Sequence, residues 1–502
     1  MTFTSHKPSR RDFVKKLGVA LGGVSILGHG AARGRALGTI PNGYTFYRVL
    51  HANAGGKFGI FPNQLGNITG SVMMASAPDN DGIGYVYVHG TVNPQFGAPA
   101  HGLFSVGIHF GVTPPVVVRV LPLAIEGVPL PVDGNTITPG HIGTGASNAL
   151  GEYVTTILPN EPSGTIAVQN SPGVYLFRPG SNLPGEWSRI IGFADPVPDG
   201  SFYGGDFGDV ALDNDQNLLL AAATTQSPAA RVSGFSGSQA LIATSLNRVS
   251  SGRVVLQTGD LLPHASAAIE SIGLIDLAAN HNFAAQVTAK QLNPAVTRSG
   301  TALIVGNTHA ASEGQKLVAA STELLSAQLA SERNIFSGQT FFGPRVDPRE
   351  DVAFVTHVGS FQGSIGSNDV EMLGYYSRGA ARSLRQTLAM GSDDEVIGLG
   401  APCIDSTGLT YGTELLGDGS TRLFISDGDR SQVVLRSEMP VSGIPATDPP
   451  GKLPISEILF GQHSTQVDAS GRLAFTAEFL RDPKGPLAAS NVITALVIGI
   501  PE

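Results

Sequence analysis

The feature that most constrains the fold is a repeat: a polar turn followed by a short apolar strand recurs along almost the whole chain of 502 residues. The clearest copies read Asp-Ser-Thr-Gly before Leu-Thr-Tyr at 405–411 and Asp-Ala-Ser-Gly before Arg-Leu-Ala-Phe at 468–475. Turn positions at 82, 151, 217, 282, 351, 408 and 471 are separated by 69, 66, 65, 69, 57 and 63 residues. This even spacing predicts a tandem-repeat architecture, because unrelated loops would not recur at one period.

Each repeat unit holds three or four short strands within some 65 residues. A unit of this kind matches one blade of a β-propeller that carries long loops. Seven units therefore predict an all-β fold, a propeller with seven blades. Stacked β-sandwiches and an open solenoid are the alternatives that the spacing leaves open.

The chain also predicts how such a ring closes. The last strand of the unit has relatives near 118, 190, 254, 318, 386 and 434, but none follows the seventh turn. An extra copy, Tyr-Thr-Phe-Tyr-Arg-Val-Leu, stands at 44–50 instead. We therefore expect this N-terminal strand to pair with the C-terminal blade, since closure removes exposed sheet edges.

Composition agrees with a loop-rich β protein. The chain holds 64 glycines and 33 prolines, and only 14% of its residues are charged. The least regular stretch is 312–334, where Leu317, Leu324, Leu325 and Leu329 lie among alanines. Their spacing predicts a short helix inserted in a blade connection.

Residues 1–36 form a separate segment. Arg10, Arg11 and Phe13 lie in a basic stretch before a glycine-diluted apolar run at 17–28, and small residues offer cleavage after Ala32 or Ala36. The run is shorter than the roughly 20 apolar residues that a membrane-spanning helix needs. The segment closely resembles the bacterial twin-arginine signal peptide, which implies export of a folded protein by the twin-arginine translocase. A basic surface helix is the alternative.

The repeat itself, a turn followed by Gly-x-Val-Ala-Phe, is similar to tandem repeats of secreted bacterial proteins. The resemblance covers nearly all of residues 37–502 and implies a single propeller-like domain there. Few functions are assigned in that family, so the resemblance concerns fold more than activity. Together with the signal segment, it predicts a periplasmic or secreted protein.

Charge and cysteine content limit the partners. Residues 37–502 carry 24 basic and 39 acidic residues, a net charge of −15, which argues against nucleic acid and anionic membrane surfaces as partners. After the signal segment no apolar run reaches transmembrane length, and 492–500 has the size of a strand. Cys403 is the single cysteine, so no intrachain disulfide forms, and a buried structural thiol is favoured over a nucleophile.

The acidic turns are the first candidate for chemistry, since the chain has no nucleophile elbow, zinc-binding His-Glu-x-x-His or phosphate-binding loop. Asp213, Asp215 and Asn217 resemble the first half of a calcium loop, with oxygen ligands at alternate positions. The loop lacks the expected glycine and closing glutamate, and turn formation by these side chains is the favoured alternative. Similar acidic residues are Asp79, Asp81, Asp206, Asp209, Asp427 and Asp429.

Polar residues late in the recurring strand are the second candidate. Alignment of the repeats places His357, Glu414 and Glu478 at one position, with His89 as a looser match. Equivalent positions in a closed propeller form a ring, so these four predict a central polar set suited to a transition metal or to acid–base chemistry. The alternative is that strand ends simply reach solvent.

Two functions follow from these features. The absence of a catalytic motif and the long loops favour an exported binding or scaffold protein, whose ligand the sequence does not identify. The alternative is a metal-dependent periplasmic hydrolase or oxidoreductase, using calcium or a transition metal, since twin-arginine export often carries cofactor proteins.

Overall fold

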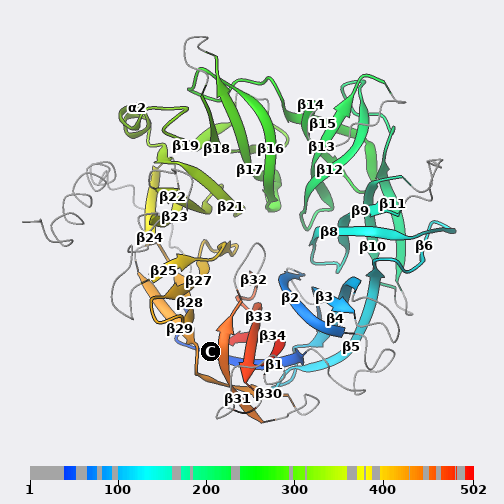
Figure 1. The fold of residues 1–502 in the computed structure, drawn as a ribbon, viewed down its shortest axis with the longest axis vertical. Helices are drawn as coiled ribbons and strands as arrows, with labels where there is room; N and C mark the ends of the chain where they lie inside the picture. Colours follow the sequence, from blue (N-terminus) through cyan, green and yellow to red (C-terminus); the bar gives the residue numbers. More distant parts are fainter. Residues whose placement is uncertain are drawn as a thin grey trace, which may run out of the picture.

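The computed structural model describes residues 39–51, 65–75, 82–92, 100–160, 171–180, 185–227, 238–292, 298–310, 314–358, 370–377, 380–386, 396–428, 430–444, 451–459, 465–480, 482 and 492–502. The described residues are almost entirely β-strand and form seven sheets of four to six strands, with one additional two-stranded hairpin. The sheets surround a central axis as the blades of a propeller (Figure 1). The all-β propeller fold predicted from the repeat is thus confirmed.

The first three sheets hold four antiparallel strands each. Sheet 1 comprises β2 (Leu65–Met74), β3 (Ile83–Val92), β4 (Ala100–His109) and β5 (Val116–Ile125). Sheet 2 comprises β8 (Pro139–Ser147), β9 (Tyr153–Pro159), β10 (Gly173–Arg178) and β11 (Glu186–Gly192). Sheet 3 comprises β12 (Phe202–Leu212), β13 (Asn217–Thr225), β14 (Ser238–Ser245) and β15 (Arg248–Gln257). The hairpin of β6 (Leu130–Val132) and β7 (Asn135–Ile137) joins sheets 1 and 2.

The next three sheets repeat the pattern with short additions. Sheet 4 comprises β16 (Ala267–Leu277), β17 (Asn282–Gln291), β18 (Ser299–Asn307), β19 (Lys316–Ser321) and β20 (Phe336–Gly338). Sheet 5 comprises β21 (Thr340–Val346), β22 (Val352–Val358), β23 (Val370–Ser377) and β24 (Ala380–Gln386). Sheet 6 comprises β25 (Val396–Leu399), β26 (Cys403–Ile404), β27 (Thr410–Leu416), β28 (Thr421–Ser426) and β29 (Ser431–Arg436).

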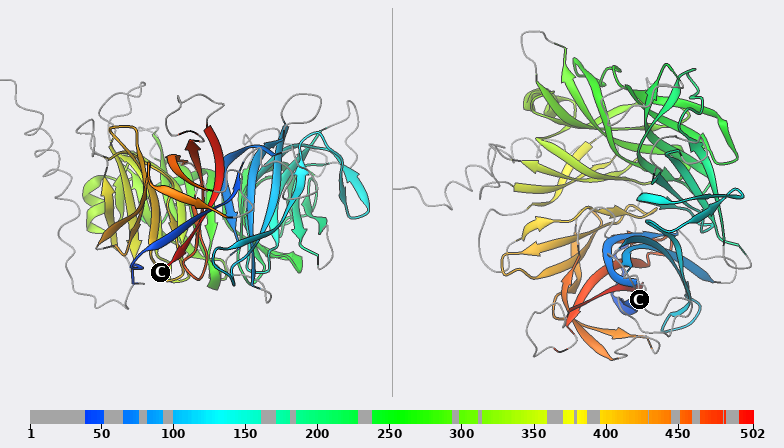
Figure 2. Two further views of the ribbon diagram at one scale, coloured as in Figure 1. Left: turned by 90° about the horizontal axis from the view of Figure 1, so that it is seen from below. Right: turned by 45° about the vertical axis from the view of Figure 1, so that its right-hand side comes forward.

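Sheet 7 draws strands from both ends of the chain. It comprises β1 (Tyr44–His51), β30 (Pro440–Gly443), β31 (Lys452–Ile458), β32 (Thr465–Val467), β33 (Leu473–Leu480) and β34 (Val492–Pro501). β1 runs antiparallel to β34, with Tyr44 opposite Pro501 and His51 opposite Ala495, and parallel to β30 on its other side. The predicted closure by the N-terminal strand is therefore confirmed, and two views of the ring show β1 beside β34 (Figure 2).

In each sheet the strand that runs into the polar turn, here called the first strand, lies nearest the axis, and the strand after the turn is called the second strand. β2, β8, β12, β16, β21, β26 and β32 neighbour one another in this order, and β32 neighbours β2 again. The second strand is buried on both faces, because adjacent sheets converge there. In β13 seven successive residues are buried, which explains its continuous apolar run.

The recurring polar turn joins the first strand of a sheet to the second. An aspartate or asparagine opens it and its Oδ1 accepts hydrogen bonds from the backbone N–H groups two and four residues later, at 2.8 and 3.0 Å for Asp405. The same pair of bonds forms at Asn148, Asp213, Asp347 and Asp468. The fourth turn residue is left-handed, as in Gly408 (φ 85°) and Gly471 (φ 75°), which explains the glycine of the repeat.

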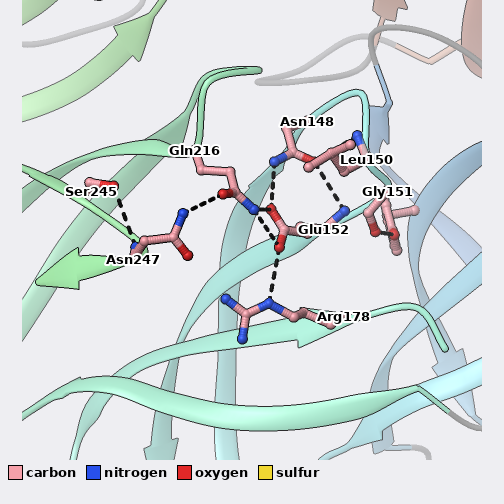
Figure 3. A network of polar contacts seen from close by, with 9 residues as sticks. Asn148, Leu150, Gly151, Glu152, Arg178, Gln216, Ser245 and Asn247 are labelled. Carbon is pink, nitrogen blue, oxygen red and sulfur yellow. Dashed lines mark hydrogen bonds and ion pairs between the residues drawn. The ribbon is translucent and has the colours of Figure 1, made fainter.

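Hydrogen bonds between residues one repeat apart tie neighbouring sheets together. Trp187 Nε1 donates to the Leu123 carbonyl at 3.0 Å, across 64 residues. At the junction of sheets 2 and 3, the buried Glu152 accepts from Asn148, Arg178 and Gln216 (Figure 3). Because Gln216 follows Glu152 by 64 residues, one polar network fixes two consecutive sheets relative to each other.

The helix expected within 312–334 is only partly found. Leu317 lies in strand β19, and the helix α2 is limited to Ala327–Glu332. Ser326 caps its N-terminus by accepting from the Leu329 N–H at 3.4 Å. Leu324 and Leu325 precede the helix, so the prediction is right only for Leu329. It was wrong about Leu317, because a buried strand and a helix face both accept leucines among alanines.

Candidate functional site

A cavity of about 220 Å³ lies on the axis, at the end of the ring where the first strands enter their polar turns. All seven sheets line it. One lining residue from each sheet, in chain order, is Met73, Ser147, Leu212, Leu277, Val346, Ile404 and Val467. We call this the axial cavity.

The side chains of the axial cavity include many carboxylates. Its lining holds Asp213, Asp276, Asp347, Asp405 and Asp468. Burial raises the pKa of three of them, Asp213, Asp347 and Asp468. The wall therefore gathers acidic groups in partly desolvated positions.

Three of these carboxylates are paired with arginines. Arg345 Nη1 lies 3.1 Å from Asp276 Oδ1, and Asp347 and Asp468 are held in the same way by Arg349 and Arg472. Neutral hydrogen-bond donors contact the remaining two, and His281 Nδ1 also lies 3.9 Å from Asp213 Oδ2. Asp405 accepts from Tyr411 Oη at 3.0 Å and Asp213 from Asn217 Nδ2 at 2.9 Å.

Asp209 lies beside the axial cavity, close to its Asp276–Arg345 pair. Its Oδ2 accepts from the Ile275 N–H at 3.0 Å, which links β12 to β16. Burial raises the pKa of Asp209 to about 6, and the nearby Arg345 offsets part of that shift. Asp206 and Asp209 both belong to strand β12, so they are not turn residues as the sequence suggested.

The suggested calcium ligands lie in the turn of sheet 3. Asp213 Oδ1 accepts from the backbone N–H groups of Asp215 and Asn217, and Asn217 Nδ2 donates to both Asp213 oxygens. The turn-forming interpretation accounts for these bonds, and the turn itself occupies the donor set that calcium would need. Asp427 likewise binds Arg430 in a turn, whereas Asp79, Asp81 and Asp429 lie outside the described residues.

The four residues of the predicted central ring lie on second strands, one strand out from those that line the axial cavity. Glu414 in β27 pairs with Arg422, whose Nε lies 2.5 Å from its Oε2. Glu478 in β33 stands opposite Glu457 in β31, and burial, together with Glu457, raises its pKa. The backbone of His357 lies in β22, but its side chain is outside the description.

His89, the fourth residue of that set, belongs to a different group, which we call the histidine cluster: His89, His101, His141, Glu126 and Tyr153. It lies between sheets 1 and 2. His101 and His141 are at the end of the ring opposite the polar turns, where β4 and β8 begin, and Tyr153 reaches His89 from the start of β9, next to the polar turn of sheet 2. His89 Nδ1 is 3.1 Å from His101 Nε2, and His89 Nε2 is 3.2 Å from Tyr153 Oη. Glu126 Oε1 lies 3.3 Å from His101 Nδ1 and 3.4 Å from His141 Nδ1.

Solvent exposure increases across the histidine cluster, from His89 and Tyr153 to His141. His89 is only 4% exposed and burial lowers its pKa to about 3, with help from His101 and His141, so its imidazole is uncharged at neutral pH. Tyr153 is fully buried, whereas the His141 side chain is 69% exposed. Of these five residues only His89 was predicted from the sequence. Tyr153 follows His89 by 64 residues, one repeat, whereas His101, Glu126 and His141 are not spaced at that period.

Cys403 is buried in β26 beside the axial cavity, and burial raises the pKa of its thiol. No helix in the described part of the chain is long and apolar enough to cross a membrane. Residues 1–36, which include Arg10, Arg11 and Phe13, lie outside that part.

The ring of sheets and its axial cavity define a protein of the β-propeller class. No family model and no curated protein matches the chain. Among solved structures, it is similar to the β-propeller domain of the Trilobed protease from Pyrococcus furiosus, with a TM-score of 0.40 and 10% identity over 85% of this chain and 95% of that chain. A polysaccharide lyase of family PL25, an ulvan lyase, gives a TM-score of 0.40 and 10% identity over 90% and 95%. These likenesses concern the fold alone.

Proposed function

We propose that the protein is an exported binding protein whose axial cavity takes the positively charged end of a small ligand. The observation that carries the proposal is the cavity itself, because all seven sheets contribute to one polar depression on the axis. Binding sites in ring-shaped folds gather where several elements converge, since convergent polar groups fix a ligand's orientation.

Size limits what enters. The volume of about 220 Å³ is below the roughly 300–1,000 Å³ typical of sites that enclose a drug-sized molecule. A single side chain or one small unit of a larger ligand fits this volume. The rest of such a ligand would lie on the surrounding turns.

Charge selects the ligand's chemistry. Five carboxylates line the axial cavity, and three of them are paired with arginines. Among the described residues Asp213 and Asp405 pair with no arginine, and His281 Nδ1 lies 3.9 Å from Asp213 Oδ2. Five carboxylates thus face three guanidinium groups, so the wall keeps an excess of negative charge. An ammonium or guanidinium group would be attracted to this wall, and a carboxylate would be repelled.

The proposal that the protein is exported is supported by the sequence of residues 1–36 alone. The twin-arginine segment supports a periplasmic or secreted location, with the translocase as a transient partner. A binding role there suits a rigid ring, because backbone N–H groups donate to the turn aspartates in one sheet after another.

Calorimetric titration with Nα-acetylarginine amide (arginine amide below), and with its uncharged analogue Nα-acetylcitrulline amide (citrulline amide below), tests the proposal. We expect arginine amide to bind and citrulline amide to bind at least about tenfold more weakly, a difference of roughly 1.4 kcal/mol. The variant Ser406→Trp places a bulky ring at an exposed position of the cavity lining and should abolish binding.

Leu150→Trp is the matched control. Leu150 is 58% exposed in the corresponding turn of sheet 2, where Ser147 rather than Leu150 lines the axial cavity. Binding should be retained in this variant. Equal binding of the two amides, no binding of arginine amide, or binding that survives Ser406→Trp would each contradict the proposal.

A further inference from the structure

The histidine cluster offers metal-binding donors at the end of the ring opposite the axial cavity. Its two outermost imidazoles both approach one oxygen: His101 Nδ1 is 3.3 Å and His141 Nδ1 is 3.4 Å from Glu126 Oε1. Donors that lie 2.0–2.1 Å from a tetrahedral ion are about 3.3–3.4 Å apart from each other. Both separations therefore match the spacing of two ligands on one ion.

Backbone contacts hold the carboxylate in place before any ion binds. The Glu126 N–H donates to the His101 carbonyl at 2.9 Å, and the next residue, Gly127, donates to the Pro139 carbonyl at 2.7 Å. Glu126 Oε1 also accepts from the Ile142 N–H at 3.2 Å. These bonds fix Glu126 between sheets 1 and 2, so its oxygen is not a mobile surface group.

A second layer of residues orients His101. An ion on His101 Nδ1 would leave the ring proton on Nε2, which lies 3.1 Å from His89 Nδ1. His89 Nδ1 is placed to accept that proton's hydrogen bond, while its Nε2–H donates to Tyr153 Oη at 3.2 Å. Outer hydrogen bonds of this kind fix the tautomer and the direction of a metal-binding imidazole.

Tyr153 is itself fixed by close packing. A Cβ at Gly145 would lie 2.5 Å from Tyr153 Cζ, so only glycine lets this ring reach His89. The phenol and His89 are thus positioned by sheet 2 and sheet 1 respectively, which gives the cluster a rigid inner side.

We propose that His101, His141 and Glu126 bind a first-row divalent transition metal such as Zn²⁺, with His89 and Tyr153 as the outer hydrogen-bonding layer. Two imidazoles and one carboxylate suit zinc, and their exposed side leaves a fourth position for water or a ligand. As the side chains stand, no three His, Cys, Asp or Glu residues in the described ranges surround one metal position. The proposed site therefore requires the exposed His141 imidazole to turn inward when the ion binds.

Cobalt substitution provides the test. The untagged full chain, purified after export and freed of metal with a chelator, is titrated with Co²⁺ and then with Zn²⁺. We expect one equivalent of Co²⁺ to give the intense visible absorption of a tetrahedral site, and Zn²⁺ to displace it. His141→Asn and Glu126→Gln should each weaken binding by at least about 100-fold, since each removes a direct ligand.

Two comparisons keep the test decisive. His264→Asn replaces an exposed histidine in a left-handed turn that asparagine tolerates, and it should bind Co²⁺ as the unaltered chain does. His141 is 69% exposed, so His141→Asn should fold normally, as circular dichroism would verify. Less than a tenth of an equivalent of bound Co²⁺, or binding unchanged in both His141→Asn and Glu126→Gln, would overturn the proposal.

Discussion

The fold buries Asp209 in a position that disfavours its ionised form. Its pKa is raised to about 6, above the ordinary range of an aspartate, because burial disfavours the ionised form, although two backbone N–H groups and Arg345 favour it. Ionisable groups in such positions concentrate at functional sites, where stability is traded for reactivity or binding. Its place close to the Asp276–Arg345 pair fits that pattern.

The raised pKa of Asp209 predicts a pH-dependent difference from Asp209→Asn. Between about pH 4 and pH 6 the folded protein binds more protons at Asp209 than the unfolded chain, so this residue's contribution to stability falls as pH rises through that window. Relative to that of the unaltered protein, the variant's free energy of unfolding should therefore rise by up to about 3 kcal/mol as the pH is raised from about 4 to about 7.5.

Urea denaturation at these two pH values measures the difference. The aspartate accepts two backbone N–H groups, one on each oxygen, whereas the asparagine that replaces it has a single acceptor oxygen. The lost hydrogen bond lowers the variant's stability by the same amount at both pH values, so it cancels when the two are compared. A stability difference that is the same at both pH values would show that Asp209 ionises normally.

Of the histidine cluster, only His89 could be predicted from the sequence. His89 was selected from its repeat position, yet its partners come from β4, β8, β9 and the segment after β5. His101, His141 and Glu126 have no equivalents at the repeat period. Their meeting depends on how sheets 1 and 2 face each other, which periodicity does not encode.

At the scale of elements, the sequence predicts the polar turns and the second strands that follow them, but not the first strands that precede them. The second strand reads as a continuous apolar run, as in β13, because both of its faces are buried. First strands such as β8 and β12 are rich in glycine and shift register against their neighbours. These irregularities hide the two-residue alternation by which strands are recognised.

Strand β1 offers a direct test of ring closure. Tyr47 stands between Ile498 of β34 and Ser442 of β30, so the backbone of β1 is bonded on both sides. Tyr47→Pro removes a ladder hydrogen bond from a central strand and should destabilise the protein by roughly 3 kcal/mol or more. Thermal unfolding followed by circular dichroism measures the loss.

The control is a proline at a sheet edge. Val118 is 49% exposed in β5, the outermost strand of sheet 1, at a point where the register with β4 shifts. Val118→Pro should cost much less, because an edge strand has one unbonded side. Equal losses in the two variants would contradict the closure that β1 provides.

At the scale of the whole molecule, the export signal predicts where the folded ring is found. Replacing Arg10 and Arg11 together by lysine keeps the charge but removes the arginine pair that the resemblance identifies as the recognised feature. We expect the variant to remain in the cytoplasm as a folded, protease-resistant precursor, as cell fractionation and immunoblotting would show.

Lys15→Arg serves as the control for that experiment, since it keeps the charge of the basic stretch and leaves the arginine pair intact. It should be exported normally. Normal export of the doubly substituted protein would contradict a twin-arginine route, whereas an unaltered protein that stays in the cytoplasm would favour the alternative of a basic surface helix.

Sheet 7 sets the order in which the molecule can be completed during synthesis. The ribosome makes β1 before any other described strand, yet both of its neighbours, β30 and β34, are made after the first six sheets. Until then β1 has both of its edges unpaired, and such strands pair readily with other chains. The interval between the first and last strands is therefore when this protein is most exposed to aggregation, and a chaperone that covers 44–51 would protect it most.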